Sequence, residues 1–197
     1  MLQISELRTK LIGPISLVVA PGECIAVLGT SGSGKSLLLR AIADLDPNDG
    51  DAALSGRSRN AMPAQDWRRL VSLVPAESGW WSDTVAPHFE PGCDVHDLLV
   101  SVGLPDAMGW DVARLSTGER QRLALVRSLA RKPSALLLDE PTSALDDDAT
   151  RRVEDIIREQ CRRGVPVILV SHDKAQTKRL AERRFVMVNG SLSADDG

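Results

Sequence analysis

Eight residues, GTSGSGKS, constrain the fold of this chain more than any other part of its sequence. They are Gly29, Thr30, Ser31, Gly32, Ser33, Gly34, Lys35 and Ser36, and they fit the pattern G-x-x-x-x-G-K-[ST]. The apolar run Cys24–Leu28 before them predicts a buried strand, and residues 35–45 after them predict a helix. Glycines let backbone N–H groups surround a phosphate, and the helix N-terminus favours the same anion. We therefore expect a nucleotide-binding loop, with Lys35 on the phosphates and the Ser36 hydroxyl on Mg²⁺.

A second chemical signal lies where another apolar run ends. Ala135–Asp139 predicts a buried strand, and Glu140 follows it directly. Two carboxylates at the end of a buried strand indicate contact with cations. We expect Asp139 to hold Mg²⁺ and Glu140 to polarise the water that attacks the γ-phosphate.

Alternating periodicities elsewhere predict the fold class. Helical patterns cover residues 119–131 and 149–163, and apolar runs that predict strands cover 70–74 and 165–170. Short alternating runs near the N-terminus and a terminal hairpin around Asn189-Gly190 add further strands, and Asp49-Gly50 predicts a hairpin turn. Strands that alternate with amphipathic helices indicate an α/β fold with a mostly parallel central sheet.

Composition narrows the function classes. The chain has 197 residues and a formal charge of −3, which argues against a dedicated nucleic-acid binder. Its three cysteines form no paired spacing, so free thiols are expected rather than a zinc site or a disulfide. Neither a signal peptide nor a membrane-spanning run is expected, and these features predict a cytoplasmic protein that reaches a membrane only through a partner.

Four motifs together resemble the ATP-binding cassette (ABC) family of transporter ATPases. The glycine-rich loop is the first. Leu115, Ser116, Thr117, Gly118 and Glu119 are similar to the family signature LSGGQ, with Thr and Glu at its third and fifth positions. Residues 140–146, which end at Asp146, are similar to the family's Walker B exit and D-loop, and His172 follows a strand as the family's histidine does. The lack of an NKxD motif favours ATP over GTP.

This resemblance implies an architecture and a mechanism. It implies a P-loop NTPase fold with an N-terminal antiparallel β-subdomain, within one ABC ATPase domain over residues 1–197. The core would take residues 1–75 and 134–197, and a shortened helical subdomain about 76–133. Two copies would enclose two Mg-ATP, with the signature residues and Asp146 of one copy meeting the nucleotide of the other. His172 would contact the γ-phosphate and position Glu140. Membrane permease subunits would hold the dimer at the inner face of the cell membrane.

The sequence departs from the family in three places. No aromatic residue precedes the glycine-rich loop, so adenine lacks its usual stacking partner. Ala76 stands where the family has a glutamine near Mg²⁺, and either Glu77 takes over that metal contact or the role is lost. The segment between loop and signature is short, and Trp80-Trp81 begins it. These two side chains are either core residues or an anchor for the membrane partner.

Two other functions remain open at this point. A soluble ATPase of the same family could act on nucleic acid or the ribosome. Alternatively, the chain could be a nucleotide-dependent regulator that hydrolyses ATP poorly because of Ala76. Glu140 and His172 argue against the regulator, because such a protein needs neither.

Overall fold

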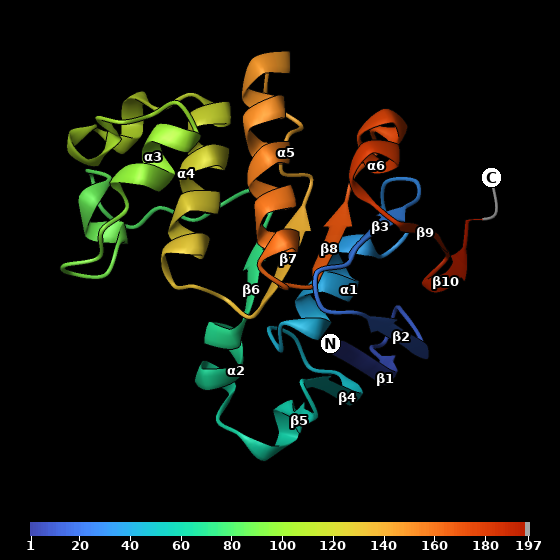
Figure 1. Ribbon diagram of the computed structural model, residues 1–197. Coiled ribbons are helices and arrows are strands. Elements are labelled where there is room, and N and C mark those ends of the chain that lie inside the picture. Colours follow the sequence, from blue (N-terminus) through green and yellow to red (C-terminus); the bar gives the residue numbers. More distant parts are fainter. Residues whose placement is uncertain (196–197) are drawn as a thin grey trace.

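Two β-sheets and the helices packed on them make up the protein, as described by a computed structural model over residues 1–195 (Figure 1). The last two residues of the expected 1–197 domain lie outside the described part. A four-stranded antiparallel sheet has the order β2-β1-β4-β5. Its strands are β1 (Leu2–Arg8), β2 (Ile15–Val19), β4 (Asp49–Leu54) and β5 (Arg57–Ser58). It lies at the lower end of the molecule in Figure 1 and confirms the expected antiparallel N-terminal sheet.

The central sheet has six strands in the order β10-β9-β3-β8-β7-β6. All pairs except the terminal hairpin β9–β10 are parallel, which confirms the expected α/β class. Its strands are β3 (Cys24–Leu28), β6 (Val71–Val74), β7 (Ala135–Asp139), β8 (Val167–Val170), β9 (Arg183–Val188) and β10 (Ser191–Ala194). Strands β3, β7 and β8 are buried throughout, as their continuous apolar sequences predict.

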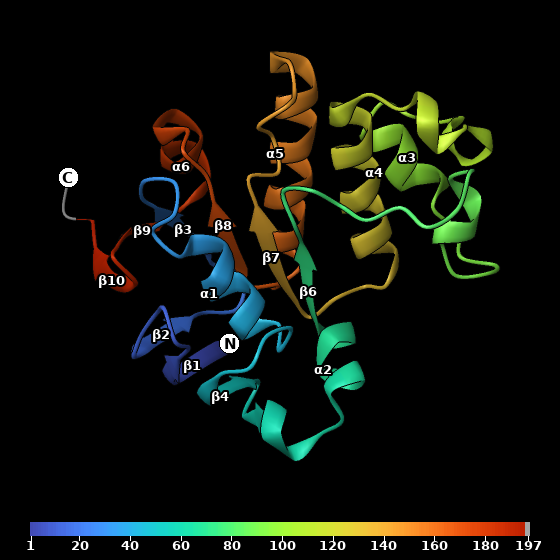
Figure 2. The same ribbon diagram turned by 180° about the vertical axis from the view of Figure 1, so that it is seen from behind.

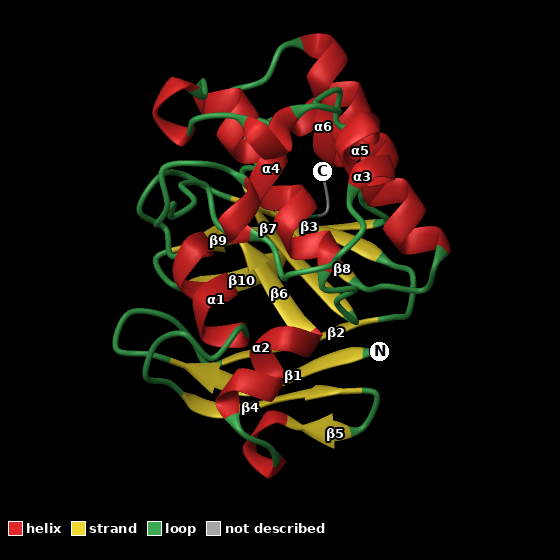
Figure 3. Ribbon diagram, turned by 90° about the vertical axis from the view of Figure 1, so that its left-hand side faces the viewer, coloured by secondary structure: helices red, strands yellow, loops and turns green. Residues whose placement is uncertain are grey.

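Helices cover both faces of the central sheet, as the opposite views of Figures 1 and 2 show. They are α1 (Lys35–Ile42), α2 (Ala64–Leu70), α3 (His96–Ser101), α4 (Thr117–Ala130), α5 (Asp147–Arg162) and α6 (Lys174–Leu180). Helix α1 lies between the two sheets and shares a core with Ile25 and Val27 of β3. Helices α4 and α5 pack on the other face in a second core with Leu136 and Leu138 of β7 (Figure 3).

Short segments fill the region between β6 and β7, where the sequence predicts a shortened helical subdomain. Besides α3 and α4 it holds the 3-10 turns η2 (Ala86–His88), η3 (Ala107–Gly109) and η4 (Val112–Arg114); a further turn, η1 (Arg59–Ala61), precedes α2. Trp67 is fully buried, and Trp110 is half-buried at the edge of the second core.

One expected turn is wrong. Asp49-Gly50 does not turn the chain but begins β4, which pairs with β1. The hairpin turn follows at Ser55-Gly56, whose φ values are 50° and 79°. Both residue pairs contain a glycine, which readily adopts the left-handed backbone of such turns. Composition alone therefore could not show which of the two pairs forms the turn.

Candidate nucleotide site

The glycine-rich loop connects β3 to α1 and leaves the start of that helix open. Gly34 occupies the N-cap position with φ 109°, and no side chain of residues 1–195 caps the first turn. The free N–H groups of that turn can therefore receive an anion. Two of its glycines are also required because a side chain would not fit. A Cβ added to Gly29 would lie 2.4 Å from the Met187 carbonyl oxygen, and one added to Gly34 would lie 2.6 Å from Ile12 Cγ2.

Lys35 currently points back over its own loop. Its Nζ donates hydrogen bonds of 2.9 Å to the carbonyl oxygens of Gly29 and Thr30. Ser33 Oγ is buried without a hydrogen-bond partner among the described residues. A loop with an unsatisfied buried hydroxyl and a cation held only by carbonyl groups is suited to an anionic ligand.

One cavity of about 510 Å³ brings the two predicted sites together. Its wall contains residues of the glycine-rich loop, both carboxylates of the second site, and the predicted histidine: Gly29, Ser31, Gly32, Gly34, Lys35, Ser36, Asp139, Glu140 and His172. Parallel strands β3, β7 and β8 all end at this edge of the sheet, which is where α/β proteins bind ligands. The Ser36 hydroxyl and the Asp139 carboxylate are oxygen donors of the kind that Mg²⁺ prefers.

Glu140 and His172 contact each other directly at the mouth of this cavity. The distance from His172 Nδ1 to Glu140 Oε2 is 2.8 Å, and the His172 backbone N–H donates to the same oxygen at 3.4 Å. Glu140 has an unusual left-handed backbone, with φ 50°. Such strain costs about 1–3 kcal/mol in a non-glycine residue and is typical of functional sites.

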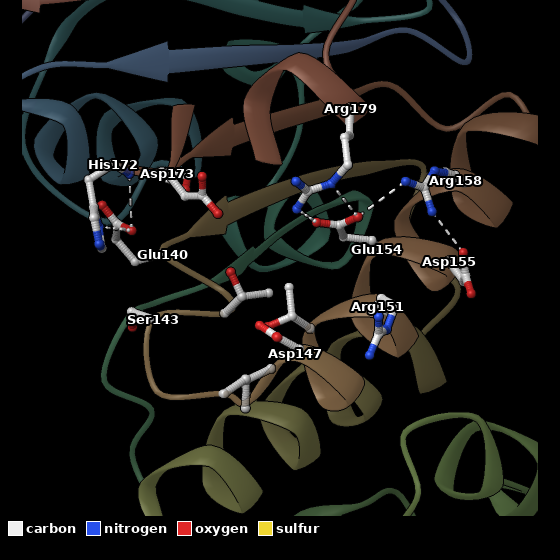
Figure 4. Close-up of a pocket in the computed structure, with 14 residues that line it drawn as sticks. Glu140, Ser143, Asp147, Arg151, Glu154, Asp155, Arg158, His172, Asp173 and Arg179 are labelled. Atoms are coloured by element: carbon white, nitrogen blue, oxygen red, sulfur yellow. Dashed lines mark hydrogen bonds and ion pairs between the residues drawn. The ribbon is translucent and has the colours of Figure 1, made fainter. Parts of the chain in front are cut away.

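A second cavity of about 700 Å³ continues from the first and shares Glu140, Ser143 and His172 with it (Figure 4). Helices α5 and α6 form its far wall. Buried Glu154 lies there between two arginines, at 3.1 Å from Arg158 and 2.5 Å from Arg179. The ion pair between Arg179 and Glu154 joins α6 to α5.

The remaining predicted site residues lie elsewhere. None of residues 115–119 appears among the described residues that line either cavity, and the same holds for Asp146. Glu77 is exposed and outside the lining of the nucleotide cavity, whereas Ala76 is part of that lining. Ser116 caps α4, and Asp146 caps α5 through a 2.8 Å bond to the Ala149 N–H.

Sequence reasoning missed Gln121. This buried side chain of α4 bonds to Glu140, Ser143 and Ala144. A single glutamine in a helix carries no spacing pattern, so only the folded chain shows what it touches.

The fold and this site together define a P-loop nucleotide-binding ATPase. A sequence profile described as "ABC transporter" matches residues 12–143, more than half of the chain. The chain belongs to the ABC transporter family and is an ATP-hydrolysing subunit of such a transporter. This result favours the transporter subunit over the two alternatives left open by the sequence.

Named relatives agree with this family. The chain is 38% identical to the probable anion import ATP-binding protein of Haloferax volcanii, over 90% of this chain and 72% of that protein. It is 41% identical to the aliphatic sulfonates import ATP-binding protein SsuB 2 of Mesorhizobium japonicum, over 95% and 75%. It is 40% identical to the Fe(3+) ions import ATP-binding protein FbpC of Streptomyces coelicolor, over 91% of this chain but only 55% of that protein.

Solved structures show the same fold. An ATP-binding subunit of an ABC transporter superposes with a TM-score of 0.86 at 22% identity, covering 99% of this chain and 90% of that one. A bacterial Atm1-family ABC exporter with ATP bound gives 0.83 at 23% identity, covering 98% of this chain and 38% of that one. In residues 1–195, no helix is both long and apolar enough to cross a membrane.

Proposed function

We propose that two copies of this chain enclose two Mg-ATP and that hydrolysis drives import through separate membrane permeases. One observation carries the proposal. The loop and both catalytic candidates share a cavity, yet the signature residues 115–119 are not among its described lining. In this proposal a second copy supplies the signature residues, whose helix N-terminus favours an anion once the cap formed by Ser116 and Glu119 gives way to the phosphate. The relatives' printed names support import, and the cargoes they name differ from one relative to the next.

Each residue of the cavity has a role in this proposal. Lys35 and the N–H groups of the loop neutralise and hold the β- and γ-phosphates. Ser36 and Asp139 are the proposed ligands of Mg²⁺, which supplies charge neutralisation on the phosphates when bound. Glu77 is the third candidate, because it follows Ala76, which lines the cavity.

Glu140 and His172 act on the attacking water. Glu140 accepts its proton as the water oxygen bonds to the γ-phosphorus and the bridging P–O bond breaks, which yields ADP and phosphate. The His172 ring contacts Glu140 through Nδ1, and in the proposed arrangement its Nε2 contacts the γ-phosphate. The observed 2.8 Å contact between His172 and Glu140 supports this arrangement.

The membrane partner contacts the surface around Trp80 and Trp81 in this proposal. The Trp81 side chain is 67% exposed, and its ring lies 4.4 Å from the His88 ring and 5.0 Å from the Arg127 guanidinium carbon. The buried side chain of His88 holds the backbone at Trp81 in place, because its Nε2 accepts a hydrogen bond from the Trp81 N–H at 2.9 Å.

The positive charge of Arg127 indicates which kind of partner segment this surface can bind. Burial lowers the pKa of Arg127, and the nearby Arg131 acts in the same direction. No ion pair between Arg127 and a carboxylate is found within residues 1–195, where it donates only to the Gly79 carbonyl oxygen. A partner segment with one carboxylate and one apolar side chain would complement the arginine and the exposed tryptophan.

Glu140→Gln tests the central claim. This variant should bind ATP but not hydrolyse it, so ATP should convert it to a dimer in gel filtration. The control is Glu140→Gln combined with Lys35→Ala, which should stay monomeric with ATP because the phosphate contacts are lost. Turnover at the wild-type rate in Glu140→Gln would remove Glu140 from its role, and an ATP-bound monomer would contradict the shared site.

A further inference from the structure

Gln121 connects the signature helix to the loop that carries Glu140. Its side chain is 5% exposed and lies on the second turn of α4. Nε2 donates to the Glu140 carbonyl oxygen and to Ser143 Oγ, both at 2.9 Å, and Oε1 accepts from the Ala144 N–H at 3.3 Å. Both donor hydrogens and the acceptor oxygen of this amide are thus used on one short segment.

The backbone of Glu140 depends on outside support. Its φ of 50° places a bulky residue in a conformation that favours glycine. Three hydrogen bonds hold it there: its own N–H donates to the Val170 carbonyl oxygen at 2.9 Å, and its carbonyl oxygen accepts from Gln121 at 2.9 Å and, within the loop, from the Ser143 N–H at 3.3 Å. The first bond comes from β8 in the rigid core, and the second comes from α4. The position of α4 therefore bears directly on the direction of the Glu140 side chain.

A second contact shows that α4 and this segment lie against each other. A Cβ added to Gly118, in the first turn of α4, would lie 2.7 Å from the Ala144 carbonyl oxygen and 3.0 Å from Leu145 Cδ2. The absence of a side chain at Gly118 is what allows this close approach. Helix and loop are thus in direct contact at two successive turns of α4.

We propose that Gln121 is a positioning residue that transmits the placement of α4 to Glu140 in the same chain. The inference rests on the proposed function, in which the first turn of α4 meets the nucleotide bound by the second copy. Closure on that nucleotide fixes α4, and the Gln121 bonds then fix Glu140 at the chain's own nucleotide. Each site becomes competent for hydrolysis only when the opposite site is filled.

A matched control separates this role from simple packing. Gln176 of α6 is also fully buried and also donates to the same loop, to Thr142 Oγ1 at 2.8 Å. No hydrogen bond between Gln176 and Glu140 is found in the described chain. Methionine has a similar length but does not donate, so Gln121→Met removes three hydrogen bonds to this loop and Gln176→Met removes one.

The experiment compares steady-state ATP hydrolysis and thermal midpoints of these two variants. We expect Gln121→Met to lower kcat by about tenfold to a hundredfold, as small misplacements of a catalytic group do, with KM for ATP within about twofold of wild type. Gln176→Met should lower the thermal midpoint less than Gln121→Met does, and it should keep kcat within about twofold of wild type. A kcat for Gln121→Met near that of wild type, or an equal loss in both variants, overturns the inference.

Dimer formation distinguishes a failed inference from a failed function. In the Glu140→Gln background, added Gln121→Met should leave the ATP-dependent dimer intact, because only the link to Glu140 is cut. If Glu140→Gln alone forms no dimer, the proposed function fails. If the dimer forms and kcat of Gln121→Met is unaffected, only the inference fails. Should Gln121→Met not fold, Gln121→Asn, whose shorter amide cannot span the same bonds, is judged by the same criteria.

Discussion

At the scale of single residues, Glu119 gives the signature of this chain a negative charge. Its Oε2 accepts from the Ser116 N–H and from Ser116 Oγ, both at 2.8 Å. The backbone hydrogen bond from Ser116, and then the hydroxyl bond, hold the pKa of Glu119 below its usual range. A carboxylate thus occupies the donors that the proposed dimer gives to the γ-phosphate.

Glu119→Gln should therefore strengthen ATP-driven dimerisation. The amide oxygen still accepts from Ser116, but the charge that repels the phosphate is gone. In the Glu140→Gln background we expect half-dimerisation at an ATP concentration about twofold to fivefold lower, with a smaller difference at high salt. Glu6→Gln, on the exposed side of β1, serves as the control for removing one charge. An unchanged or higher ATP requirement would argue against this effect of Glu119.

Residue patterns predict which side chains line the cavity, but not which side chains hold them in position. Lys35, Asp139, Glu140 and His172 line one cavity, as the motifs predict, because parallel strands β3, β7 and β8 end at one edge. Gln121 could not be predicted, because its partners follow it by 19 to 23 residues and depend on the left-handed turn at Glu140. Such a role arises only when the loop folds back on the helix.

At the scale of elements, the segment between β6 and η2 offers a testable surface. Trp81→Ala should leave basal ATP hydrolysis and thermal stability unchanged, because this side chain is mostly exposed. Binding to inside-out membrane vesicles of the source organism, stripped of the native subunit, should fall by about tenfold or more, as for a tryptophan anchor. Val18→Ala, another exposed apolar residue on β2, should bind as wild type does. Equal binding by both variants would place the partner elsewhere.

Elements were predicted best where one period dominates the sequence. The expected helices at 119–131 and 149–163 correspond to α4 and α5 with ends shifted by one or two residues, because caps at Ser116 and Asp146 start them earlier. The short turns η2, η3 and η4 had no periodic signal. Their positions follow from packing on α4, as at buried Val85 and Ala107 of the second core.

At the scale of the whole molecule, one arginine joins the two sheets. Arg183 of β9 donates from Nε to Glu23 Oε1 at 2.6 Å and from a terminal nitrogen to the Val18 carbonyl oxygen of β2 at 2.5 Å. The Ala20 N–H donates to the other oxygen of Glu23. Sequence patterns predict both sheets but not this link, because Val18 and Arg183 are separated by 165 residues.

Acid should weaken this link and with it the whole fold. Burial opposes ionisation of Glu23, but the bonds from Arg183 and from the Ala20 N–H outweigh it and hold the pKa of Glu23 below its usual value of 4.5. Its stabilisation is therefore complete above the unfolded-state pKa and is lost as pH falls through the lower folded-state pKa. Glu23→Gln should lower the free energy of unfolding by about 1–2 kcal/mol at pH 7, and by progressively less toward pH 3. Urea unfolding of both proteins across this range measures the difference, with Glu6→Gln as the exposed control. A difference that stays constant from pH 7 to pH 3 would mean that ionised Glu23 does not stabilise the joint between the sheets.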